Sequence, residues 1–170
     1  NERSIMSEQS IRAGSSRAAH AVGPAASRSR QSSASVDASD STLVMRLPRE
    51  KIVFVVDFLP VGRLPGRGMI DFYPLEAEDS IKKVLGMDWE RLIPGHPDSG
   101  GRLGTKQDVQ DQLTLLQEAS AEMKKLGQEG KCWDTAEKEF KLPKYATWPG
   151  YEQSLPFIAR RYCGLWGRGT

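Results

Sequence analysis

The sequence has few of the residues that build metal and disulfide frameworks, and it has no long apolar run. Its 170 residues include only two cysteines and two histidines, so neither a disulfide-rich scaffold nor a zinc-finger framework fits. No stretch approaches the ~18 apolar residues that span a membrane. A net charge of only +2 argues against strong non-specific binding to nucleic acid. We therefore expect neither a membrane nor a nucleic-acid partner.

Residues 1–41 lack lysine and aromatic side chains. They hold 12 Ser, 8 Ala and 5 Arg, a composition that buries too little apolar surface to offset the entropy lost on ordering. We expect a low-complexity tail, disordered or loosely docked, with no specific role. The alternative is that its arginines bind an acidic partner. The first residues show no signal peptide, and Asn1 in place of Met leaves a processed or truncated start open.

From Thr42 to Thr170 the pattern becomes that of an α/β region. Two apolar segments, 42–47 and 51–58, are separated by Pro48-Arg49-Glu50, which predicts a hairpin. The second segment is almost continuously apolar, which indicates a strand buried on both faces. The elements expected next are a Pro/Gly-rich loop at 59–68, a helix at 75–87 and a strand at 89–93.

The C-terminal part of the sequence is helical in pattern. Thr105 and Asp108 stand in a capping-box arrangement, which marks a helix start after a Gly-rich loop. The expected buried stripe of this helix is Val109, Leu113, Leu116, Ser120 and Met123. A short helix is expected at 133–140, and a last one at 149–166 that is interrupted or restarted at Pro156. The resulting order, β-β-α-β-α-α-α, predicts an α/β fold closed by helices.

The two cysteines, Cys132 and Cys163, form no C-x-x-C pair. They could join in one disulfide, or both could be buried free thiols. The sequence leaves these two alternatives open.

Two side chains of the metal-ligand type stand where predicted strands end. Asp57 ends an apolar segment, where a carboxylate is costly to bury unless it is paired or bound to a metal. His96 follows Ile93 after a Pro-Gly turn. Taken singly, each is more typical of a solvated or hydrogen-bonded surface group. If their strands are neighbours, both side chains reach the same sheet edge, and we therefore treat Asp57 and His96 as candidate metal ligands.

The order of these motifs resembles the C-terminal half of metallo-β-lactamase-fold hydrolases, over roughly residues 37–170. The matching motifs are Val55-Val56-Asp57, Ile93-Pro94-Gly95-His96, Pro143-Lys144-Tyr145, Trp148-Pro149-Gly150-Tyr151 and Leu155-Pro156-Phe157. The resemblance implies half of an αββα sandwich, with two zinc ions lying between stacked halves. It places Asp57 as the metal-bridging aspartate and His96 as the last histidine ligand. It also suggests a bacterial periplasmic or secreted location.

Most of the family's metal ligands are absent from this sequence. No H-x-H-x-D-H motif occurs, Ala38 stands where the middle histidine is expected, and Val56 stands where the family often has glycine. A catalytic zinc site needs at least three protein ligands, so two ligands leave the dinuclear site incomplete.

The resemblance implies zinc-activated water attacking an amide or ester-type bond of a small-molecule substrate. With this ligand set we expect weak hydrolysis, or none, from the chain alone; the catalytic and substrate-binding residues are not assigned. The alternative is a non-catalytic structural or interaction subunit. A half-sandwich leaves one apolar sheet face uncovered, and such a face favours self-association or completion of the fold by a second chain.

Overall fold

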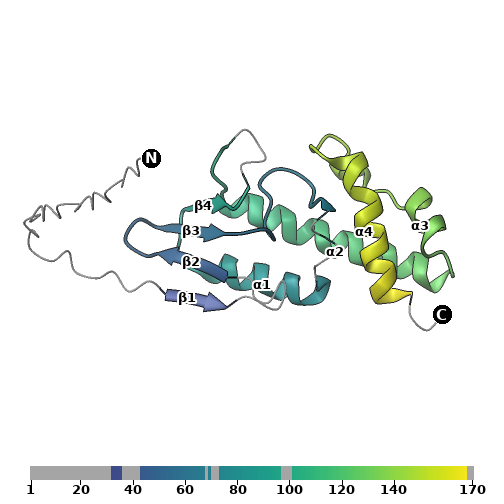
Figure 1. Ribbon diagram of the computed structural model, residues 1–170, viewed down its shortest axis with the longest axis horizontal. Coiled ribbons are helices and arrows are strands. Elements are labelled where there is room, and N and C mark those ends of the chain that lie inside the picture. Colours follow the sequence, from purple (N-terminus) through teal and green to yellow (C-terminus); the bar gives the residue numbers. More distant parts are fainter. Residues whose placement is uncertain (1–31, 36–42, 68, 70–72, 97–100, 168–170) are drawn as a thin grey trace, which may run out of the picture.

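The computed structural model describes residues 32–35, 43–67, 69, 73–96 and 101–167. In chain order the elements are β1 (Ser32–Ser35), β2 (Leu43–Leu47), β3 (Ile52–Val55), α1 (Pro74–Gly86), β4 (Arg91–Pro94), α2 (Lys106–Gln128), α3 (Asp134–Glu139), the 3-10 helix η2 (Pro143–Tyr145) and α4 (Tyr151–Trp166). A small sheet occupies one end of this arrangement, and α3 and α4 occupy the other (Figure 1). The expected mixed α/β class is confirmed.

The sheet has the strand order β1-β2-β3-β4. β2 and β3 pair antiparallel, as the hairpin prediction requires, whereas β3 and β4 pair parallel. β1 pairs antiparallel with β2 although it lies within the segment expected to be a tail. Its Ser and Ala residues show no apolar alternation, so the sequence pattern alone does not indicate a strand there. The rest of that segment, 1–31 and 36–41, lies outside the described residues.

β3 is shorter and less enclosed than its apolar sequence indicates. It ends at Val55, and Asp57 has a φ of 70°, which an extended strand does not contain. Burial on both faces is wrong: Val53 and Val55 are fully buried, but Ile52 and Phe54 are only half-buried. The apolar run therefore reflects one covered face and one open face.

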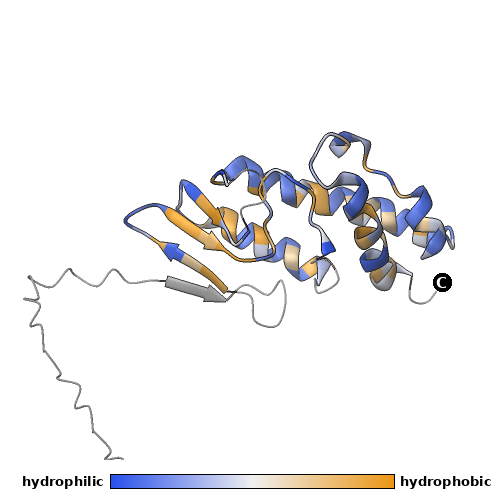
Figure 2. Ribbon diagram, turned by 45° about the horizontal axis from the view of Figure 1, so that its top comes forward, coloured by the Kyte–Doolittle hydropathy of each residue, from blue (hydrophilic) through white to orange (hydrophobic). Residues whose placement is uncertain are grey.

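The covered face of the sheet is the one against α1 and α2, which lie behind it in Figure 1. Four side chains on this face are fully buried: Val44, Val53, Val55 and Leu92. On the opposite face Met45, Phe54 and Ile93 align across three strands. Met45 and Leu43 are exposed there, and no helix of the described residues covers them. Strands β2, β3 and β4 are coloured mainly as hydrophobic in Figure 2.

α2 begins as the sequence predicts. The Thr105 side chain accepts from the Asp108 N–H while the Asp108 carboxylate accepts from the Thr105 N–H, which satisfies two backbone donors at the helix start. Four of the five expected stripe residues are buried; the exception is Ser120, which is half-buried and accepts a hydrogen bond from Trp166 Nε1 at 3.2 Å.

α4 runs without interruption through Pro156, so the expected break at that residue is wrong. Proline removes one helical N–H, which leaves the carbonyl of Glu152 without its usual partner. Glu152 is exposed, so water can bond that carbonyl. Leu155 and Ile158 on either side of the proline are buried, and their packing keeps the helix continuous.

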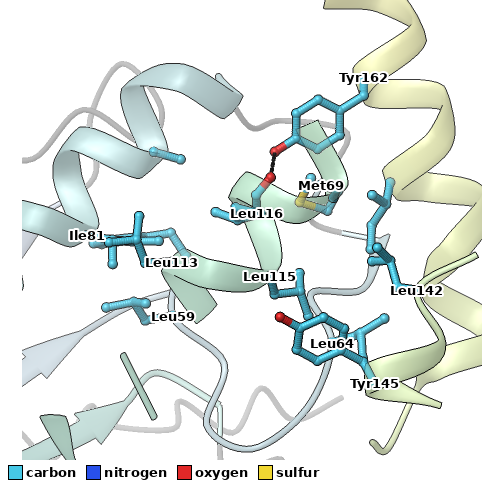
Figure 3. Close-up of a cluster of buried hydrophobic side chains, with 14 of the residues drawn as sticks. Leu59, Leu64, Met69, Ile81, Leu113, Leu115, Leu116, Leu142, Tyr145 and Tyr162 are labelled. Carbon is cyan, nitrogen blue, oxygen red and sulfur yellow. Dashed lines mark hydrogen bonds between the residues drawn. The ribbon is translucent and has the colours of Figure 1, made fainter. Parts of the chain in front are cut away.

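The main core lies between the helices and the loop that follows β3 (Figure 3). Tyr162 of α4 is fully buried and its hydroxyl donates to the carbonyl of Leu116 in α2 at 3.0 Å. Leu64 and Met69 of the loop are also fully buried in this cluster. No helix in the described part of the chain is long and apolar enough to cross a membrane.

Candidate functional site

Asp57 and His96 meet at the carboxyl-end edge of the two parallel strands. His96 Nε2 lies 2.6 Å from Asp57 Oδ1. Val55 and Pro94 are register partners at the ends of β3 and β4, and each candidate follows its partner by two residues. Both side chains are 67% exposed. The structure thus brings together the two residues that the sequence singled out, because their strands are immediate neighbours.

A tight turn holds Asp57 at this edge. The Phe58 N–H donates to the Val56 carbonyl at 2.9 Å, which closes a three-residue turn around Asp57. With a φ of 70°, Asp57 is the central residue of the rarer, strained form of γ-turn. Strained backbone of this kind often occurs at functional sites, where the surrounding structure maintains it. Here the buried side chains of Val55 and Phe58 anchor both sides of the turn.

Gly95 allows the two strand ends to approach closely. Its N–H donates to the Val55 carbonyl at 2.8 Å. A Cβ at Gly95 would lie 2.9 Å from Val56 Cα, closer than real Cβ atoms come, and 3.0 Å from Val56 Cγ1, which is tighter than most Cβ contacts. The sequence indicated a Pro-Gly turn. In the structure, glycine is needed here because the ends of β3 and β4 lie too close together for a Cβ. Gly95 therefore sets the spacing that lets His96 reach Asp57.

The donor types suit zinc, but their number does not complete a site. Two ligands bound tetrahedrally at ~2.1 Å lie about 3.4 Å apart. A separation of 2.6 Å is therefore close enough for a small side-chain adjustment to place both donors on one ion. Among the described residues, no group of three or more His, Cys, Asp or Glu side chains is placed to hold a metal ion. The chain thus offers a zinc ion two ligands at this edge.

Arg102, in the loop before α2, pairs with a carboxylate at the start of that helix. Its guanidinium donates to both carboxylate oxygens of Asp108. This pairing, with hydrogen bonds from Thr105, lowers the pKa of Asp108 to about 2. Just beyond Arg102, Gly104 pairs with Leu92, so the chain returns to the outer edge of β4. Arg102 therefore fixes the start of α2, a role that the sequence pattern alone did not indicate.

No protein-family profile matches this chain, and a search of curated proteins finds no significant match. The family resemblance stays a prediction that rests on the order of the motifs.

Proposed function

We propose that this chain is the half of a metallo-β-lactamase-like zinc hydrolase that supplies the aspartate and the last histidine of the metal site. The observation that carries the proposal is the 2.6 Å contact between Asp57 and His96. Aspartate and histidine are both usual zinc ligands. Their exposure leaves room for a metal ion and for further protein beside them.

A working site needs at least one further protein ligand, and we propose that protein outside these 170 residues supplies it. Zinc at such a site provides an activated water near neutral pH for hydrolysis of an amide or ester-type bond. Within this chain, the γ-turn orients the Asp57 carboxylate and the Gly95 contact fixes where His96 lies. The small-molecule substrate is set by surrounding loops rather than by these two ligands.

Zinc uptake by the full chain tests the proposal. We expect the chain to take up one Zn²⁺ weakly and saturably, measured by competition with a chromophoric chelator. Asp57→Asn and His96→Ala should each abolish this uptake, because either leaves a single ligand. Asp79→Asn is the matched control, since that carboxylate pairs with Lys82 on α1 and should leave zinc uptake unchanged.

Two outcomes contradict the proposal in different ways. Uptake that is equal in the wild type and both site variants would remove Asp57 and His96 as ligands. Two tightly bound ions per chain, measured by elemental analysis, would overturn the incomplete site. With excess Zn²⁺, we expect hydrolysis of a chromogenic β-lactam and of a nitrophenyl ester to stay at the rate of the Asp57→Asn variant.

The open sheet face favours a second candidate function, a non-catalytic interaction subunit. Leu43 is 48% exposed on that face, and the neighbouring Met45, Phe54 and Ile93 extend the apolar surface. Such a continuous patch is typical of a protein interface. In the proposed hydrolase the same face would meet the other half of the sandwich, so the two candidates use one surface.

Charge placed on this face tests the second candidate. We expect the wild type to self-associate with rising concentration in analytical ultracentrifugation, and Leu43→Glu to stay monomeric. Leu75→Glu is the control, because Leu75 is similarly exposed (43%) but lies on α1. A wild type that is monomeric at every concentration contradicts self-association.

A further inference from the structure

Cys132 and Cys163 lie side by side, where the link between α2 and α3 meets the last turns of α4. The N–H of Trp133, the residue after Cys132, donates to Cys163 Sγ at 3.0 Å. Cys132 Sγ lies against Gly167, at 2.7 Å from where a Cβ would stand. The Gly167 N–H in turn donates to the Cys163 carbonyl at 2.8 Å. Both sulfur atoms therefore lie at the same turn of α4.

The two thiols are free and in contact, and their surroundings differ. Burial, together with a hydrogen bond that the Cys163 thiol donates to the Cys132 sulfur, raises the pKa of Cys163 to about 12. Cys163 is fully buried, whereas Cys132 is only half-buried. A dissolved oxidant therefore reaches Cys132 first, and Cys163 is positioned as the second, resolving thiol.

We propose that Cys132 and Cys163 form a reversible disulfide that joins the α2–α3 link to α4. This inference goes beyond the proposed function and does not depend on zinc. The oxidant is a small disulfide such as oxidised glutathione. Cys132 loses its proton and its thiolate attacks one glutathione sulfur; the glutathione disulfide bond breaks, a mixed disulfide forms, and the first glutathione leaves as a thiolate that takes up the proton.

In the second step the Cys163 thiol loses its proton and its sulfur attacks Cys132 Sγ. The bond between Cys132 and glutathione breaks, and the second glutathione leaves as a thiol. Two protein thiols are thereby oxidised to one disulfide while one glutathione disulfide is reduced to two thiols, so atoms and electrons balance.

The disulfide stabilises the helical part of the chain. It closes a loop of about 30 residues, which reduces the conformational entropy of the unfolded chain. For a folded unit of this size the expected rise in Tm is about 10 °C. The bond holds α3 and η2 within the closed loop, so it secures the elements that pack on α4.

Graded ratios of oxidised to reduced glutathione, applied to the full chain, test the proposal. We expect the wild type to lose two alkylatable thiols together, and intact mass to fall by two hydrogens. Peptide mapping should find Cys132 linked to Cys163, and Tm should rise by about 10 °C. Cys132→Ser should keep the fold of the reduced protein by circular dichroism and lose the Tm rise.

Three outcomes overturn the proposal. They are two thiols that remain alkylatable in excess oxidised glutathione, a mixed glutathione disulfide that persists at Cys132, and disulfide-linked dimers. Cys163→Ser separates these routes, because it leaves Cys132 able to form the mixed disulfide but removes the resolving thiol. A Tm rise of the same size in that variant would also count against an intramolecular bond.

Discussion

The sheet and the helical part of the molecule differ in how their apolar side chains are exposed to solvent. α4 buries Leu155, Ile158 and Tyr162, and the Tyr162 hydroxyl points to the Leu116 carbonyl of α2 (Figure 3). The sheet buries one face and leaves Leu43 and Met45 exposed on the other. Both parts expose some large apolar side chains, such as Trp133 and Leu75 in the helical part. In the sheet, the exposed Leu43 and Met45 are neighbours on one face. This difference is the basis for proposing an interface on the sheet.

The aspartate at the start of α2 and the aspartate at the sheet edge also differ in their partners and exposure. Asp108 caps α2 and is paired with Arg102 within the chain. Among the described contacts, the Asp57 side chain has one polar partner, His96. Both side chains are largely exposed. A carboxylate that secures a helix start stabilises the fold, whereas an exposed Asp–His pair at a strained turn contributes little stability. The second kind of pair is the one typical of a functional site.

Truncating one leucine in each part should give the largest contrast. Leu115→Ala removes a fully buried side chain of α2, and we expect a loss of about 2–5 kcal/mol in the free energy of unfolding. Leu43→Ala removes an exposed side chain from the open face, and we expect a change below about 0.5 kcal/mol. Urea unfolding of the monomer measures both. Similar losses from the two variants would mean that the sheet face is covered after all.

Glycine substitutions should give an intermediate effect and test how the site is held together. Gly95→Ala forces a Cβ to within 3.0 Å of Val56, and we expect a cost of about 1–3 kcal/mol, because the ends of β3 and β4 must move apart. Gly86→Ala is the control: nothing lies within 4 Å of the added Cβ at the end of α1, so stability should hold or rise by up to about 1 kcal/mol.

NMR signals of the His96 ring give a second measurement of the effect of Gly95→Ala. These signals should shift in Gly95→Ala, because the contact with Asp57 is lost, and should stay unchanged in Gly86→Ala. A Gly95→Ala protein with wild-type stability and unchanged His96 signals would show that the close approach of the strands does not position this pair.

Removing charge from the two aspartates should give the smallest effect. Asp108→Asn should lower the free energy of unfolding by about 1 kcal/mol at neutral pH, because it weakens the capping box of α2. Asp57→Asn should change it by less than about 0.5 kcal/mol, since Asp57 is largely exposed. Chemical unfolding at neutral pH measures both values.

The pH dependence separates the two aspartates further. Folding lowers the pKa of Asp108 from 3.8 to about 2, so its stabilisation is present above pH 3.8 and is lost as pH falls toward 2. The difference between wild type and Asp108→Asn should therefore shrink across that range. A constant difference from pH 5 to pH 2 would contradict the role given to the Arg102–Asp108 pair.

Local sequence signals predicted the elements whose causes are local. The capping box of Thr105 and Asp108 marked the start of α2, and Pro48-Arg49-Glu50 marked the hairpin between β2 and β3. The pattern failed where tertiary contacts decide. Pro156 lies inside a continuous helix because packing on both sides outweighs one lost hydrogen bond. β1 exists through its pairing with β2, which its Ser and Ala residues do not indicate.

The sequence by itself determined which groups can act as ligands, an aspartate and a histidine at the ends of strands, because residue type and strand patterns are local properties. Tertiary structure decided that β3 and β4 are parallel neighbours and that Gly95 lets their ends touch, which puts Asp57 and His96 2.6 Å apart. It also brought Cys132 beside Cys163. These juxtapositions depend on strand order and helix packing between distant segments, and residue spacing along the chain does not contain that information.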